Sequence, residues 1–527
     1  MWPSIGVARD VLDDPVSTAG MKLAKEWLEE CISPTHAGCQ GSIETQLPTR
    51  VIDLGVEGEH PRLLVTNGAR GKYVTLSHCW GKVSPLVTTK STLKKRIAEI
   101  CAAELPKTFQ DAIFVTHVLG FRYLWIDSLC IVQDSKEDWD IESSRMQDVY
   151  ACAIFNISAD AALDSTSGLG TRRRLPLGKA VGSPKNGDYV RVGPMFDWTD
   201  SSGVSHVPRD KSDLKHILDT RAWVLQERML SPRILHFSEY EMAWECDTCC
   251  RCECMVLPRK PAARSFRGIL GDSQLSKKEG LQAWYDLVSE YSILDLTLES
   301  DKLPAVAGLA SRAASYFSKT YIAGLWKEDL PYCLLWSVRC RNLVSGPSAR
   351  LQEYVPSWSW ASIRGQIAIR TAMPVLQYLT AYEPEIKGLD CNYRGGSVYG
   401  SLQYGIIKIK GKKAPVSFDR YHRVIMKTIE QTHEMEGTQV FPDVTDWSEF
   451  QDADDCFVFI IFMGNHIRHH ILLANTLILR PVNQTPGNSL GDTCYRRIGC
   501  YQYLTSLSST SVDFLLEQFQ EEQICIV

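Results

Sequence analysis

Short apolar runs and helical stretches alternate along residues 73–159. Residues 122–127 are mostly aromatic and β-branched and end on a carboxylate, which is typical of a buried strand with a polar exit. Residues 72–76 and 153–159 carry the same strand pattern. The two stretches between these runs place apolar residues at helical spacing. The order strand, helix, strand, helix, strand predicts an α/β fold with a parallel sheet.

Both helices begin with the sequence of a capping box. Asp111 follows Thr108 by three residues, and Asp138 follows Ser135 in the same way, so each pair is expected to bond the first turn of its helix. Gly120 is expected to end the first helix. The inner face of the second helix is expected to hold Trp139, Met146, Tyr150 and Ala153.

Polar residues follow two of the predicted strands. They are Ser77, His78 and Cys79 after the first strand and Asp127, Ser128 and Cys130 after the second. Ligands of open parallel sheets bind outside the carboxyl ends of the strands, so neighbouring strands would turn these groups toward one crevice. The alternative is that they cap loops and bond to the backbone, as polar groups at strand ends often do.

The same patterns divide the rest of the chain. Residues 219–228 predict a helix with Trp223 and Glu227 on one face at i and i+4, and residues 234–237 and 241–245 predict a hairpin after it. We expect Trp358 and Trp360 to pack in a core rather than to bind carbohydrate. The expected parts are an N-terminal lead-in at 1–70, an α/β domain at 71–230 with a variable insertion at about 163–215, a cysteine-rich and then helical, aromatic-rich region at 231–364, and a β-rich region at 365–527.

Composition narrows the classes of function. The 527 residues include 57 basic and 62 acidic side chains, so no excess positive charge indicates a nucleic-acid partner. The longest apolar run, residues 456–463, is too short for a membrane span, and the first residues lack the apolar core of a signal peptide. A cytoplasmic protein with reduced thiols is therefore expected.

Two groups of soft metal ligands stand far apart in the sequence. Cys31, His36 and Cys39 form the first group, and Cys246 and Cys249 belong to the second. A tetrahedral zinc site needs four ligands, which neither group supplies by itself. We therefore hypothesise a structural zinc that joins the two groups; the alternative is a set of reduced, partly buried thiols.

Five blocks of the sequence carry a family resemblance. Residues 73–81 (Tyr-Val-Thr-Leu-Ser-His-Cys-Trp-Gly), 105–112, 123–134 (Tyr-Leu-Trp-Ile-Asp-Ser-Leu-Cys-Ile-Val-Gln-Asp), 145–153 and 221–231 resemble the successive blocks of the fungal heterokaryon incompatibility (HET) domain. The resemblance implies a filamentous-fungal protein of self/nonself recognition whose HET domain triggers regulated cell death. It also implies a protein partner or self-association.

HET domains in turn resemble TIR domains, which are small flavodoxin-like modules, some of which cleave NAD. In those, the catalytic glutamate lies on a helix shortly after a tryptophan or similar aromatic residue. The resemblance puts forward Glu142, which follows Trp139 at a spacing one residue shorter than the usual TIR pattern, with Asp127 orienting a ribose hydroxyl. The alternative for Glu142 is a solvent-facing position on an amphipathic helix. The substrate crevice would then be lined by Ser77, His78, Trp80, Ser128, Cys130 and Trp139.

Two other hypotheses for the function of the HET unit remain. In one, Cys79 or Cys130 is a nucleophile with His78 as its base; extended neighbours point to opposite faces, which disfavours the pair His78 and Cys79. In the other, the unit has no enzymatic activity and signals by self-association or partner binding, with exposed aromatic residues around Trp80 and Trp139 as the contact patch.

Overall fold

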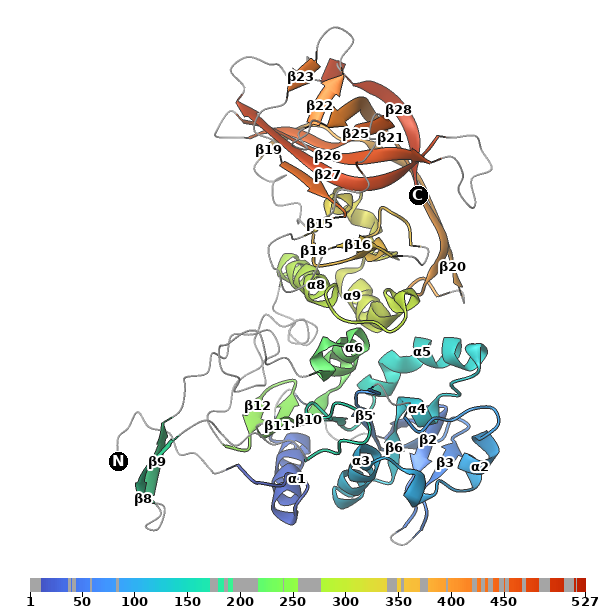
Figure 1. Cartoon of the computed structure of the whole chain (residues 1–527), viewed down its shortest axis with the longest axis vertical. Coiled ribbons are helices and arrows are strands. Elements are labelled where there is room, and N and C mark those ends of the chain that lie inside the picture. The colour runs from blue at the N-terminus through green and yellow to red at the C-terminus, as the bar shows by residue number, and fades with distance from the viewer. Residues whose placement is uncertain are drawn as a thin grey trace. The chain divides into compact units, whose positions relative to one another are not determined.

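A computed structural model of the chain (Figure 1) describes residues 11–36, 39, 44–56, 59–81, 85–170, 179–183, 188–192, 217–239, 241–254, 276–338, 348–351, 355–369, 378–394, 397–418, 424–427, 432–434, 439–444, 450, 455–466, 471–482, 493–506, 516–517 and 519–527. The chain divides into two compact units, Met1–Gln274 and Leu275–Val527. Most of the expected insertion at 163–215 lies outside the described residues. The division of the chain into four parts stays a prediction.

The first unit is built on an eight-stranded sheet with the order β12-β11-β10-β7-β5-β6-β2-β3. Its central strands β6, β5, β7 and β10 are parallel, whereas the flanking strands are antiparallel. The strands are β2 (Arg50–Asp53), β3 (Arg62–Val65), β5 (Tyr73–Ser77), β6 (Tyr123–Trp125), β7 (Asn156–Ser158), β10 (Arg233–Phe237), β11 (Met242–Cys246) and β12 (Cys250–Cys252). The α/β class and the parallel pairing of the predicted strands are confirmed, but the sheet as a whole is mixed rather than parallel; the predicted hairpin, which is β10 with β11, is confirmed.

The helices of this unit, apart from α1, lie in the connections between the parallel strands. They are α1 (Thr18–Ile32), α2 (Leu93–Ala98), α3 (Lys107–Val118), α4 (Asp127–Cys130), α5 (Lys136–Ala151) and α6 (Ala222–Leu230), with short 3-10 helices at Ala102–Glu104 and Leu218–Thr220. Among the described residues, the unit also holds a two-stranded pair, β1 (Thr45–Gln46) with β4 (Arg70–Gly71), and a hairpin, β8 (Lys179–Ser183) with β9 (Asp188–Val192). On α5, Met146 and Tyr150 are buried as expected, Trp139 is half-buried, and Ala153 lies beyond the helix end.

The capping box predicted for α3 is wrong. The N-cap of α3 is Pro106, so Thr108 already lies inside the first turn. Its hydroxyl instead donates to the Asp164 carbonyl (3.3 Å) and accepts from the Gly168 N–H (3.0 Å). Asp111 likewise accepts from the Leu169 N–H (3.0 Å). The two polar side chains are used to hold residues 164–169 against α3, which leaves them unavailable as caps.

The capping box predicted for α5 is also wrong, although Ser135 is the N-cap residue. The Ser135 hydroxyl donates to the Glu137 carboxylate (2.9 Å) and makes no cap bond. Asp138 accepts from the Val132 N–H (2.8 Å) and pairs with Arg50 of β2. The Asp138 carboxylate therefore forms a tertiary ion pair with Arg50 instead of the predicted helix cap.

In the described part of the second unit, two α-helices accompany a large β structure. α8 (Lys277–Tyr291) and α9 (Ala307–Phe317) are joined to 3-10 turns at Glu299–Asp301, Pro304–Val306, Lys327–Asp329, Tyr332–Leu335 and Trp360–Ser362. Short strand pairs are β13 (Tyr321–Ile322) with β14 (Leu325–Trp326), β15 (Ser337–Val338) with β18 (Ile367–Ala368), and β16 (Ala349–Arg350) with β17 (Ile363–Arg364). The region predicted as helical is thus only partly so.

A ten-stranded sheet forms the β-rich region. Its strands are β19 (Tyr378–Tyr382), β20 (Glu385–Tyr393), β21 (Leu402–Phe418), β22 (Val424–Lys427), β23 (Thr432–Glu434), β24 (Gln439–Pro442), β25 (Cys456–His466), β26 (Ile471–Val482), β27 (Cys494–Ser506) and β28 (Gln520–Ile526). β21 pairs with both β25 and β28, which closes β25, β26, β27, β28 and β21 into a ring. Trp358 and Trp360 are fully buried and donate to the Gly405 and Gly324 carbonyls, so their predicted core packing is confirmed.

One buried ion pair anchors the ring to the short strands. Arg497 and Asp443 are both fully buried, and the guanidinium donates to the carboxylate over 2.7 Å. The same guanidinium stacks 3.4 Å from the Trp336 ring and donates to the Trp336 carbonyl (2.5 Å). Removing one partner of such a pair leaves an uncompensated charge in the interior.

We therefore expect Asp443→Ala to lower the free energy of unfolding by about 3–5 kcal/mol. The measurement is urea denaturation of the whole chain. Glu521→Ala is the control, because the pair Lys410–Glu521 (3.3 Å) is largely exposed and should contribute at most ~1 kcal/mol. Equal losses in the two variants would contradict the importance of the buried pair.

Candidate functional site at the carboxyl ends of the parallel strands

The four parallel strands bring their carboxyl ends to one edge of the sheet. Their spatial order is β6-β5-β7-β10, so the winding of the chain reverses between β5 and β7. In open α/β sheets, ligands bind outside the strand ends at such a reversal. The residues that follow β5, β6 and β7 are therefore the first place to look for a site.

A cluster around His78 joins the ends of β5 and β6. Trp80 donates its Nε1–H to Asp127 Oδ2 (3.0 Å), and His78 Nδ1 lies 3.9 Å from Asp127 Oδ1. The predicted crevice residues Ser77, His78, Trp80 and Asp127 are thus brought to one edge of the sheet. Burial lowers the pKa of His78, partly opposed by the Asp127 charge, so the imidazole is neutral near pH 7. Within the described residues, His78 Nε2 is buried and has no hydrogen-bond partner.

The thiols of this region are poorly suited to nucleophilic attack. Burial raises the pKa of Cys79 to about 11 and that of Cys130 to about 12. Both thiols therefore stay protonated near pH 7, and a thiolate is the reactive form. Ser128 is fully buried beside them, and its hydroxyl has no partner among the described residues.

A second cluster, around Glu227, lies at the end of β5. Thr75 donates to Asn156 Oδ1 (3.0 Å), Asn156 Nδ2 donates to the Ser77 hydroxyl (2.9 Å), and Ser77 donates to Glu227 Oε2. The Tyr150 hydroxyl hydrogen-bonds with Ser77 and Glu227 as well. This directional chain of donors ends on one carboxylate of α6. We call these residues the Glu227 cluster.

The carboxyl group of Glu227 titrates near neutrality. Burial raises its pKa from the ordinary 4.5 to about 7, although the hydrogen bond from Ser77 favours the ionised form. Carboxylates poised in this way are frequent at functional sites. Sequence reasoning placed Glu227 on a helix but gave it no role. The signal available was Trp223-x-x-x-Glu227, where the tryptophan and the glutamate stand four residues apart.

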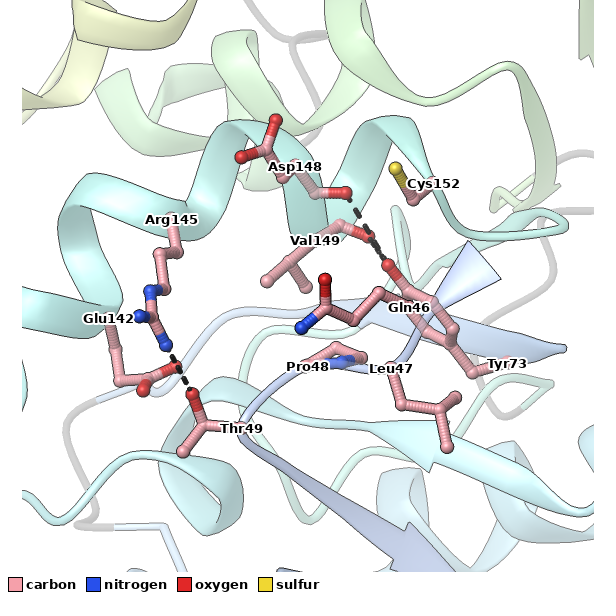
Figure 2. Close-up of a pocket in the computed structure, with 10 residues that line it drawn as sticks. All are labelled: Gln46, Leu47, Pro48, Thr49, Tyr73, Glu142, Arg145, Asp148, Val149 and Cys152. Atoms are coloured by element: carbon pink, nitrogen blue, oxygen red, sulfur yellow. Dashed lines mark hydrogen bonds between the residues drawn. The ribbon is translucent and has the colours of Figure 1, made fainter. Parts of the chain in front are cut away.

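Glu142 lies in a different place, in a pocket of about 360 Å³ between α5 and residues 46–49 (Figure 2). The alternative that Glu142 faces solvent is wrong, because its exposed fraction is 2%. Its Oε1 lies 3.9 Å from Arg50 Nη2, and Arg145 beside it donates to Thr49 (2.9 Å). The pocket lining is Gln46, Leu47, Pro48, Thr49, Tyr73, Glu142, Arg145, Asp148, Val149 and Cys152.

The predicted catalytic and crevice residues therefore fall in two places. Asp127 accepts a hydrogen bond from Trp80 and lies near His78 at the strand ends, whereas Glu142 lines the pocket and lies 3.9 Å from Arg50. Trp139 is half-buried on the same helix as Glu142 but does not line that pocket.

A buried charge network extends the strand-end edge to β10. His236 contacts Asp160 (2.8 Å) and Glu245 (3.2 Å), and Arg228 donates to Glu245 (3.2 Å). Burial alone would lower the pKa of His236, but the two carboxylates outweigh it and raise the pKa to about 9. His236 is thus an imidazolium at neutral pH.

The raised pKa predicts a pH-dependent stability. The unfolded chain releases the His236 proton near pH 6.5 and the folded chain near pH 9, so the free energy of unfolding should fall across this interval by up to about 3 kcal/mol. His236→Gln removes the titrating group and should remove this fall. The measurement is urea denaturation of both proteins at pH 6.5 and pH 9, and parallel pH dependences would contradict the assignment.

The structure also places four of the five predicted metal ligands close together. One ligand atom each from Cys31, His36, Cys39 and Cys246 lie within 4.8 Å of one another. Cys249 Sγ is 3.5 Å from Cys246 Sγ but does not belong to this group of four.

Comparison with known proteins gives a match to a family model. Residues 73–227 match the family model described as Heterokaryon incompatibility protein (HET). No curated protein and no solved structure matches the chain. Among the described residues, no helix combines the length and the apolar character needed to cross a bilayer.

Proposed function

We infer from the HET domain at residues 73–227, which makes this chain a HET-domain protein, that it acts in heterokaryon incompatibility. Further, we propose that the HET unit is the effector of regulated cell death and acts by cleaving NAD. The observation that carries this proposal is Glu227, a buried carboxylate with a near-neutral pKa at the strand-end edge of the sheet.

Topology supports a flavodoxin-like or TIR-like kinship. Numbered along the chain, the parallel strands β5, β6, β7 and β10 have the spatial order 2-1-3-4, which is also the beginning of the flavodoxin-like order. Trp223 and Glu227 on α6 have the full spacing of the TIR pattern, whereas Trp139 and Glu142 are one residue short. We therefore assign the catalytic role to Glu227 in preference to Glu142.

The chemistry follows from charge. Positive oxocarbenium character builds on the ribose as its bond to nicotinamide breaks, and a fixed carboxylate stabilises it. The donor chain through Asn156 and Ser77 holds the Glu227 carboxylate in place before the reaction begins. Asp127, held by Trp80, would orient a ribose hydroxyl, and His78 Nε2 supplies a further hydrogen-bonding atom.

Glu142 is kept as a second candidate because of its pocket. The buried Glu142 carboxylate lines a pocket of about 360 Å³, and this volume is within the usual range of ligand sites. Glu142 and Glu227 are both buried glutamates of the same domain, so each serves as the matched control for the other.

We expect Glu227→Gln to lower nicotinamide release from NAD at least ~100-fold, while Glu142→Gln retains it. The measurement uses the whole chain at high protein concentration, with circular dichroism to verify folding. Loss of activity in Glu142→Gln alone would move the site to the pocket. If folded wild-type protein released no nicotinamide, and Glu227→Gln still killed cells, the HET unit would instead act as a non-enzymatic assembly module.

The pKa of Glu227 gives a second expectation for the same reaction. Only the ionised carboxylate stabilises the oxocarbenium, so kcat/KM should rise about tenfold per pH unit below pH 7 and level off above it. The measurement is the pH profile of nicotinamide release between pH 5 and pH 9. A profile that falls from pH 6 to pH 8 would indicate that Glu227 acts as a protonated acid instead.

A further inference from the structure

The four metal-ligand side chains described above come from the two segments that flank the matched domain. Cys31 is in the last turn of α1, His36 and Cys39 follow that helix, and Cys246 is the last residue of β11. α1 packs against β11 within the first unit (Figure 1). All four ligands therefore lie outside residues 73–227 and converge where the two flanks meet.

The spacing of the ligand atoms suits a tetrahedral ion. With zinc–sulfur and zinc–nitrogen distances of about 2.3 and 2.0–2.1 Å, a tetrahedron separates sulfur from nitrogen by about 3.6 Å. Cys246 Sγ and His36 Nε2 lie 3.6 Å apart. Three thiols and one imidazole form a set that zinc commonly takes in structural sites.

The neighbours of the ligands support a charged site. The Arg233 guanidinium donates to Cys31 Sγ over 3.3 Å, which stabilises a thiolate at that position. The Thr248 hydroxyl lies 3.5 Å from Cys39 Sγ, within reach of a thiolate there; it also lies 2.5 Å from His36 Nε2, and it must release that nitrogen when the ion binds. Arg251 of β12 forms a bidentate ion pair with Glu30 of α1, which holds the two flanks together beside the ligands.

We propose that Cys31, His36, Cys39 and Cys246 bind one structural zinc ion that fastens the segment after α1 to the end of β11. A full set of four protein ligands leaves no open position for a reacting water, so the ion has a structural and not a catalytic role. Ligands so far apart in the sequence meet only in the folded chain, so zinc binding stabilises the fold of the first unit.

Two other arrangements compete with this one. Cysteines that approach each other closely could form a disulfide in an oxidising environment. A second group, Glu241, Cys252 and Cys254, also has its ligand atoms within 4.8 Å, but it offers only three. The experiment must therefore separate the four-ligand group from the disulfide and from the three-ligand group.

The first test measures zinc per chain by mass spectrometry of the whole protein, incubated with zinc under reducing conditions and then desalted. We expect one zinc per chain in the wild type, in Cys249→Ser and in Cys252→Ser, and at least a tenfold lower content in Cys31→Ser and Cys246→Ser. A wild type without zinc would overturn the proposal. So would loss in Cys252→Ser but not in Cys246→Ser, or a disulfide between Cys31 and Cys246 in the reduced sample.

The second test does not depend on the folding of the serine variants. Cobalt is loaded in place of zinc into the wild type and into His36→Cys, and the thiolate-to-cobalt absorption is recorded. The number of thiolate ligands rises from three to four in His36→Cys, so this absorption should increase by about one third while the metal stays bound. An absorption that is absent in the wild type, or unchanged in His36→Cys, would exclude this set of ligands.

Discussion

The parallel pairing of β5 with β6 on one side and β7 on the other is the constraint on which the first unit depends. All residues of β5 are buried, so the side chains at its end contact the neighbouring elements. Successive residues of an extended chain point to opposite faces. Ser77 accordingly reaches Glu227 of α6, whereas His78 meets Phe109 of α3 and lies near Asp127. The end of this one strand thus contributes to two polar clusters, one around Glu227 and one around His78 and Asp127.

Keeping polar groups in this core carries an energetic cost. Thr75, Ser77 and Asn156 are nearly inaccessible to solvent, and each unpaired hydroxyl or amide there would cost about 1–3 kcal/mol. The donor chain that ends on Glu227 satisfies them, but burial still disfavours the ionised carboxylate. Apolar residues would fill the same space without that penalty. This energetic cost is consistent with the catalytic role proposed above for Glu227.

Local patterns were sufficient to predict the parallel strands β5, β6 and β7, the helices α3, α5 and α6 and the hairpin of β10 with β11, because alternation and helical spacing depend on neighbouring residues. They did not predict β3, β12, α2 or α4. They were insufficient for side chains whose partners are distant. Thr108 and Asp138 have the sequence of caps, yet contacts with residue 164 and with Arg50 decide their bonds. Glu227 accepts a hydrogen bond from Ser77, which lies 150 positions earlier in the sequence. The burial and the raised pKa of Glu227 therefore could not be predicted from the sequence of its helix. The solvent-facing alternative for Glu142 is wrong for the same reason, since charged residues on a helix are usually exposed unless they are paired.

The flanks of the matched segment are part of the same structure as the candidate site. β10 continues the parallel sheet beyond residue 227, and β11 pairs with it along its whole length. Glu245 and Cys246 are neighbours on β11 and point to opposite faces. Glu245 enters the network of His236 and Arg228, while Cys246 joins the ligands near α1. Strand β11 thus carries both a proposed metal ligand and a member of the buried charge network. A displacement of β11 would therefore move Cys246 and Glu245 together.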